Sequence, residues 1–164
     1  MTTYYHSASV LLRPGSVIEP GNYGRMLGTY RNDNGPNGWK LATEFALDAR
    51  RAREFSALPS RLSCCFAYLD VASALATRDR LGGLANILYE VELADDDASS
   101  HIGDFDLISR CYIPRPDLAF LQTIEDVGTM YWGGKPGGTR ELLTNSGLRV
   151  VRQVNWGTPS GSAA

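Results

Sequence analysis

The most regular pattern of apolar and polar positions lies at residues 87–93. Odd-numbered positions from Ile87 to Leu93 are apolar or aromatic, while Glu90 and Glu92 stand between them. Because successive side chains of a strand point to opposite faces, this alternation predicts a β-strand with one buried face. Shorter segments rich in β-branched, aromatic or aliphatic residues predict further strands at 3–7, 16–21, 62–69, 140–144 and 148–154.

One long segment carries apolar residues every three or four positions, with charged residues on its other face. This spacing predicts a helix that ends before Pro59. Its apolar positions are Leu41, Phe45, Ala49, Ala52 and Phe55. Asp70 is expected to cap a second helix, because a carboxylate there accepts hydrogen bonds from free amides of the first turn. A third helix is predicted over 118–129.

Turn-forming residues separate these elements. Residues 31–38 are rich in Asn, Asp, Gly and Pro and predict a loop, and a glycine-rich loop is expected at 133–138. Residues 145–147 (Asn-Ser-Gly) predict a tight turn that joins the last two strands as a hairpin. Hairpin-like joins mixed with a few helices favour an α+β fold.

Length and composition narrow the class of protein. The 164 residues predict one domain over 1–156, followed by a small, polar, flexible tail at 157–164. Hydrophobic residues make up 43% of the chain and the formal net charge is −2. These values exclude a disordered chain and a global positive field for binding nucleic acid. The 17 Gly, 8 Pro and 8 Tyr indicate many turns and an aromatic-lined cleft.

The expected location is the cytoplasm, with no membrane contact. Apolar runs are much shorter than the ~20 residues of a membrane helix, and the N-terminus lacks the pattern of a signal peptide. Cys64 and Cys65 are adjacent and Cys111 stands alone, so no disulfide framework is expected. We interpret the three cysteines as small buried residues.

Motifs for common active sites are missing. The sequence has no phosphate-binding P-loop, no Gly-x-Ser-x-Gly nucleophile motif and no zinc-binding His-Glu-x-x-His. With only His6 and His101 as histidines, and with the acidic run at 95–97 read as a solvated loop, no metal is expected. The residues by themselves therefore predict only a small α+β domain with a histidine near the end of its first strand.

Three segments resemble ADP-ribosyltransferases. Residues 4–8 (Tyr-Tyr-His-Ser-Ala), with the segment 11–21 that ends in Pro-Gly, resemble the opening of the rifamycin-modifying enzymes. Residues 66–74 resemble the superfamily's aromatic-ended strand and Ala-rich helix. Residues 140–144 (Arg-Glu-Leu-Leu-Thr) resemble the strand that carries the catalytic glutamate in DNA-targeting ADP-ribosyltransferase toxins. The chain is also similar to an uncharacterised bacterial family at 59–66 and 89–93.

The resemblance implies a fold and a reaction. The fold would be two packed, strongly bent antiparallel sheets with a few helices and a cleft for NAD, the co-substrate. The enzyme would release nicotinamide and transfer ADP-ribose to a nucleic-acid base, a protein or a small molecule. A bacterial toxin of this kind implies an antitoxin or immunity protein as a partner. An NAD glycohydrolase and a non-catalytic nucleotide-binding module are the alternatives.

The resemblance also implies roles for individual residues. His6 would bind the dinucleotide, Phe66 would stack on nicotinamide, and Glu141 would bind the ribose and stabilise positive charge as the glycosidic bond breaks. Tyr68, on the same strand face, rivals Phe66. Further cofactor contacts are expected from Ser7, Asn22, Tyr23, Arg25, Arg61 and Tyr68. Acceptor contacts are expected from Tyr131, Trp132 and Thr139.

Each assignment has a structural alternative. His6 would otherwise be a surface or hydrogen-bonded structural group, and Phe66 a core residue. Glu141 would otherwise be a solvent-facing strand residue. Tyr131 and Trp132 are equally compatible with packing inside the domain.

Overall fold

The computed structural model describes residues 2–30, 36–81, 86–134 and 137–154, so residues 31–35 of the predicted loop and the predicted tail lie outside these ranges. Within the described residues it contains five helices and seven strands, which confirms the α+β class. The helices are α1 (Asn22–Leu27), α2 (Pro36–Glu54), α3 (Val71–Arg80), α4 (Phe105–Cys111) and α5 (Phe120–Trp132). The strands are β1 (Tyr4–Ala8), β2 (Val17–Ile18), β3 (Cys65–Tyr68), β4 (Ile87–Leu93), β5 (Ser100–Asp104), β6 (Arg140–Thr144) and β7 (Leu148–Gln153). None of these helices is long and apolar enough to cross a membrane.

The strands form one antiparallel sheet with the order β2-β7-β4-β1-β3-β6-β5. The sheet has a seam between β1 and β3, where Tyr5 and Tyr68 are the one pair in register among the described residues. By contrast, β1 pairs with β4 along all five of its residues, and β3 pairs with β6 along all four. We call β2, β7, β4 and β1 the first half of the sheet, and β3, β6 and β5 the second half.

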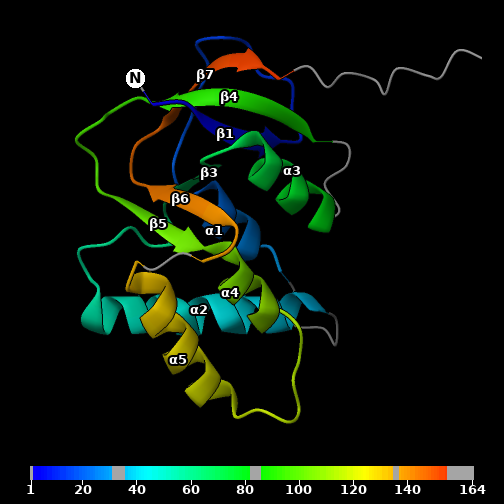
Figure 1. The fold of residues 1–164 in the computed structure, drawn as a ribbon, viewed down its shortest axis with the longest axis vertical. Coiled ribbons are helices and arrows are strands. Elements are labelled where there is room, and N and C mark those ends of the chain that lie inside the picture. Colours follow the sequence, from blue (N-terminus) through cyan, green and yellow to red (C-terminus); the bar gives the residue numbers. More distant parts are fainter. Residues whose placement is uncertain (1, 31–35, 82–85, 135–136, 155–164) are drawn as a thin grey trace, which may run out of the picture.

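The short link between β6 and β7 shows that the sheet is not flat. Four strand spacings separate these strands in the sheet order, which is about 19 Å in a flat sheet at ~4.8 Å per strand. The link from Thr144 to Leu148 reaches at most about 14 Å when fully extended. The two halves must therefore fold towards each other. Figure 1 shows β1, β4 and β7 above β3, β5 and β6.

The last two strands do not form the predicted hairpin. β6 pairs with β3 and β5, whereas β7 pairs with β2 and β4. The segment after β4 holds the turn between them, since Asn145 N donates to the carbonyl oxygen of Ser99, and Ala94 N donates to that of Gly147. The Asn-Ser-Gly turn thus carries the chain from one half of the sheet to the other.

The bend creates two apolar layers. Side chains between the two halves form one layer, whose buried members are Cys65, Ala67, Tyr89, Val91, Leu142, Leu148 and Val150. Helices α2, α4 and α5 cover the other face of the second half (Figure 1). The buried members of that layer are Leu47, Cys64, Ile108, Cys111, Ile124, Tyr131, Trp132 and Leu143. All three cysteines are free and buried, as predicted.

Helix α2 buries a different face from the one predicted. Phe45 is 56% exposed, and Ala49 and Ala52 are exposed as well. The buried positions are Thr43, Glu44, Leu47 and Arg50. Glu44 and Arg50 are turned inward because both find polar partners on other elements there. The predicted apolar stripe was therefore wrong by about one helical position.

Several element boundaries differ from those predicted. Residues 36–38, expected in a loop, form the first turn of α2, where the fixed φ of proline suits a helix start. The predicted cap of α3 is confirmed, because Ser73 N donates to Asp70 Oδ1 at 2.8 Å. Helix α5 covers Phe120–Trp132, whereas the predicted helix covered 118–129. Helices α1 and α4 and strand β5 were not predicted.

Candidate functional site

A cavity of about 680 Å³ is lined by β1, β3 and β6 together with α1, α2 and α3. Its volume falls within the ~300–1,000 Å³ typical of small-molecule and cofactor sites. Segments far apart in the sequence meet on its walls. The residues singled out from the sequence that line it are His6, Ser7, Asn22, Tyr23, Arg25, Arg61, Phe66, Tyr68 and Glu141.

The turn before α1 places three of these residues. Gly21 has a φ of 87°, which glycine adopts without strain, so α1 begins directly after the Pro-Gly turn. Asn22 and Arg25 are exposed at the cavity wall, and Tyr23 points inward. Arg25 Nη1 donates to the carbonyl oxygen of Pro20 at 3.3 Å.

The residues expected to contact an acceptor do not line the cavity. Tyr131 and Trp132 are 1% and 2% exposed, and their rings pack against each other and against His101. Stacking on an acceptor needs exposed rings, so the structure corrects that assignment to the core alternative. Thr139 lies before β6, where its backbone N–H donates to the carboxylate of Asp106 at 3.0 Å.

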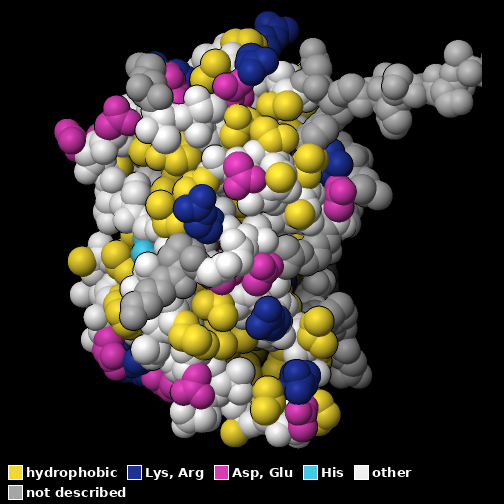
Figure 2. All heavy atoms as spheres, viewed as in Figure 1, with side chains coloured by type: hydrophobic (Ala, Val, Ile, Leu, Met, Phe, Trp, Pro, Cys, Tyr) yellow, Lys and Arg dark blue, Asp and Glu magenta, His cyan; other side chains and the backbone are white. Residues whose placement is uncertain are grey.

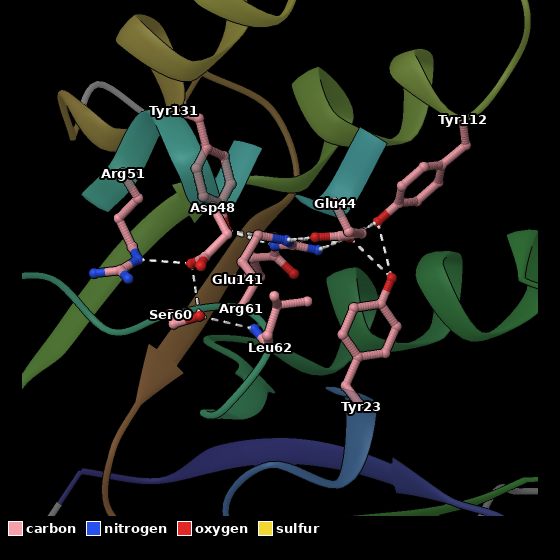
Figure 3. Close-up of polar contacts among 10 residues, drawn as sticks. All are labelled: Tyr23, Glu44, Asp48, Arg51, Ser60, Arg61, Leu62, Tyr112, Tyr131 and Glu141. Carbon is pink, nitrogen blue, oxygen red and sulfur yellow. Dashed lines mark hydrogen bonds and ion pairs between the residues drawn. The ribbon is translucent and has the colours of Figure 1, made fainter. Parts of the chain in front are cut away.

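Glu141 is held by a buried ion pair with Arg61. The two residues are 1% and 2% exposed. Tyr131 completes the group, because its hydroxyl donates to Glu141 Oε1 at 2.7 Å and accepts from Arg61 Nη1 at 2.6 Å (Figure 3). Burial raises the pKa of Glu141, while Arg61 and the Tyr131 hydroxyl act in the opposite direction. Because both partners contact Oε1, the carboxylate has one fixed orientation.

Glu44 binds the other side of Arg61. Its Oε2 accepts from Arg61 Nε at 2.9 Å, and its Oε1 accepts from the Tyr23 hydroxyl at 2.9 Å and from the Tyr112 hydroxyl. Burial and the negative charge of Glu44 raise the pKa of both tyrosines, so their hydroxyls remain donors. Figure 3 shows a continuous row of polar contacts from the two tyrosines through Glu44 and Arg61 to Glu141.

Neither Glu44 nor Tyr112 was singled out from the sequence. A signal for Glu44 was present, since it lies three residues after Leu41 and three before the buried Leu47, on one helix face. A carboxylate on the apolar face of a helix needs a buried partner. Tyr112 follows α4, which was not predicted, and carries no comparable signal.

His6 is bound to the backbone of the neighbouring strand. Its Nδ1 lies 2.7 Å from the carbonyl oxygen of Phe66, so Nδ1 carries the proton. Burial lowers the pKa of the imidazole, which favours the neutral ring. In that tautomer Nε2 is an acceptor, suited to a hydroxyl group of a ligand.

Phe66 and Tyr68 share one face of β3 and both line the cavity. The guanidinium of Arg61 lies 4.9 Å from the centre of the Phe66 ring, and the Tyr23 ring meets it edge-on at 5.3 Å. Tyr68 stands directly opposite Glu141 in the pairing of β3 with β6. The structure thus brings both candidates for the stacking residue to the same wall.

No group of three or more His, Cys, Asp or Glu side chains among the described residues is arranged to hold a metal ion. The acidic residues 95–97 lie in an exposed turn, as predicted.

The sequence matches no protein-family model and no curated protein.

Proposed function

We propose that the protein is an NAD-dependent mono-ADP-ribosyltransferase that uses the cavity between β1, β3 and β6. The observation that supports this most is the meeting of His6, Phe66 and Glu141 on the walls of one cavity. These residues come from the three segments that resemble the superfamily. A cavity assembled from three distant segments is a stronger indication than any one of the short motifs.

The split of the sheet supports the finer fold proposal. We propose that the two halves correspond to the two bent sheets of an ADP-ribosyltransferase. The two halves meet at the seam between β1 and β3, where Tyr5 and Tyr68 are the one pair in register among the described residues. His6 and Phe66 lie next to this seam on its two sides. Ligands of other folds also bind where neighbouring strands separate, because side chains from both sides face one space.

The proposed reaction breaks the bond between nicotinamide and C1′ of the ribose. Nicotinamide leaves with the bonding electron pair, an acceptor nucleophile forms the new bond to C1′, and that nucleophile loses its proton. Glu141 would stabilise the positive charge that develops on the ribose. Arg61 opposes the effect of burial on the pKa of Glu141 and Tyr131 fixes the orientation of the carboxylate, so both are positioning residues. Phe66 or Tyr68 would stack on nicotinamide.

The proposed acceptor is a nucleic-acid base, a protein or a small molecule. On the face shown in Figure 2, basic side chains are scattered among acidic and apolar ones. The net charge of the chain is −2. A long nucleic-acid footprint needs about one cation for each phosphate contact. A nucleic-acid acceptor would therefore be recognised over a few nucleotides.

The test is incubation with NAD and candidate acceptors, with nicotinamide release and ADP-ribose transfer followed together. Glu141→Gln keeps the shape of the side chain and removes its charge, so we expect both signals to fall about 100-fold or more. Glu54→Gln is the matched control, since Glu54 is an exposed residue of α2 outside the cavity. Its rates should equal those of the unchanged protein.

The other outcomes identify the alternatives. Nicotinamide release without transfer to any acceptor indicates a glycohydrolase. Binding of NAD without release of nicotinamide indicates a non-catalytic nucleotide-binding module. If millimolar NAD fails to raise the melting temperature, the cavity does not bind the dinucleotide and the proposal fails.

A further inference from the structure

Lys40 is held between two aromatic rings at the wall of the same cavity. Its Nζ lies 5.2 Å from the centre of the Tyr23 ring and 5.1 Å from that of Tyr112. Both distances fall within the ~6 Å of a cation–π contact. The side chain is half-buried and comes from the first turns of α2. The two rings limit the positions that the ammonium group can take. A lysine that rotates freely on the surface has no such restriction.

Among the described residues, Lys40 makes no ion pair. The nearest acidic group along the helix is Glu44, whose oxygens accept from Arg61 and from the hydroxyls of Tyr23 and Tyr112. The same two tyrosines thus turn their ring faces to Lys40 and their hydroxyls to Glu44. The charge of Glu44 acts on Lys40 only from a distance, and burial lowers the pKa of the lysine.

The other cations of the cavity differ in their partners. Arg61 lies between Glu44 and Glu141, so its charge is compensated. Arg78 pairs with Asp79. Arg25 lines the same cavity as Lys40 and, within the described part of the chain, makes its hydrogen bond to a neutral carbonyl group. Among the described cations that line the cavity, Lys40 of α2 and Arg25 of α1 are therefore the two without an ion pair to a carboxylate.

We propose that Lys40, with Arg25 of α1 lining the same cavity, binds a phosphate group of the ligand. Lysine binds phosphate as a point charge with three donors and needs no planar partner. The rings of Tyr23 and Tyr112 stabilise the ammonium while the cavity is empty and leave its donors available. The identity of the phosphate as part of NAD rests on the proposed function. The anion site itself does not.

The first experiment uses inorganic pyrophosphate and measures its binding by calorimetry. The unchanged protein should bind it, and Lys40→Gln should weaken binding about tenfold or more. Lys40→Arg, which keeps the charge, should retain most of the affinity. Arg149→Gln is the control, because Arg149 is exposed on β7 outside the cavity. Pyrophosphate that binds Lys40→Gln as tightly as the unchanged protein overturns the proposal, as does equal loss in Arg149→Gln.

The second experiment identifies the source of the phosphate. If the phosphate belongs to the dinucleotide, Lys40→Gln weakens the binding of NAD. The binding of nicotinamide riboside, which lacks phosphate, then stays the same. If the phosphate belongs to an acceptor, the variant weakens the binding of a nucleoside monophosphate and leaves the binding of NAD unchanged. Equal weakening of NAD and the riboside overturns the proposal. Pyrophosphate binding through Lys40 in a protein that releases no nicotinamide would support the anion site and reject the transferase. Nicotinamide release that Lys40→Gln leaves unchanged, with no pyrophosphate binding, would do the reverse.

Discussion

The imidazole Nδ1 of His6 donates to the carbonyl oxygen of Phe66 across 2.7 Å. Two of the three residues proposed to act on NAD are thus joined directly, one through its side chain and the other through its backbone. The contact fixes both the ring orientation of His6 and its tautomer. It also ties β1 to β3 beside the seam of the sheet.

Folding stability should depend on pH through His6. Burial lowers its pKa below the ordinary 6.5 in the folded protein. As the pH falls below about 6.5, the unfolded chain takes up this proton before the folded one, so stability falls. Above that pH the contribution is fully present. Urea unfolding at pH 7.5 and pH 5 should show a smaller acid loss for His6→Asn than for the unchanged protein. Identical losses would show that His6 is protonated equally in both states.

Replacing Arg61 by Met should destabilise the fold by about 3–5 kcal/mol, because it leaves Glu44 and Glu141 as buried charges without their cation. Urea unfolding measures this change. Adding Glu141→Gln to the variant should recover part of the loss, since one of the two charges is then removed. Arg149→Met, at an exposed site, is the control and should change stability little. A loss in Arg61→Met no larger than in the control would contradict the buried network.

The Tyr131 hydroxyl should act on stability and on the orientation of Glu141, and leave acceptor binding unchanged. Tyr131→Phe removes contacts to Glu141 and Arg61 and should cost about 1–3 kcal/mol. If the proposed transferase reaction is found, its kcat should fall while the KM for the acceptor stays the same. Tyr4→Phe, in the other apolar layer, is the control. A raised KM for the acceptor would contradict this and indicate that Tyr131 contacts the acceptor.

Gly24 should not tolerate a side chain, because a Cβ there would lie 1.9 Å from the carbonyl oxygen of Leu62. Gly24→Ala should therefore push α1 away and destabilise the protein by more than about 2 kcal/mol. Ligand binding should weaken as well, since Tyr23 and Arg25 move with the helix. Gly28→Ala is the matched control, with its nearest contact at an ordinary 3.4 Å. Thermal melting of the two variants side by side measures the difference.

The described strands other than β5 could be predicted because their signals are local. The alternation over 87–93 and the helix cap at Asp70 depend on neighbours in the sequence, and the structure confirms both. The strands that β6 and β7 pair with could not be predicted, because a tight turn normally joins two strands that pair with each other. Here the bend of the sheet gives each strand better partners in its own half.

The buried face of α2 failed for a different reason. Apolar periodicity assigned Phe45 to the core and did not single out Glu44, although Glu44 is the buried residue of the two. The inward face is set by a polar network whose other members, Arg61 and Tyr112, lie on distant segments. Local hydrophobicity carries no information on such partners. The resemblance pointed to cavity residues on β1, β3 and β6. It missed Glu44 and Lys40 because both lie outside the segments that are similar to the superfamily.

The seam between β1 and β3 has a consequence for recognition. Tyr5 and Tyr68 are the one pair in register between the two strands among the described residues, and His6 ties β1 to the carbonyl oxygen of Phe66 beside them. This part of the cavity wall therefore depends on a side-chain contact in place of a full ladder. Truncating His6 would loosen the wall as well as remove a ligand contact, so binding and turnover should fall together.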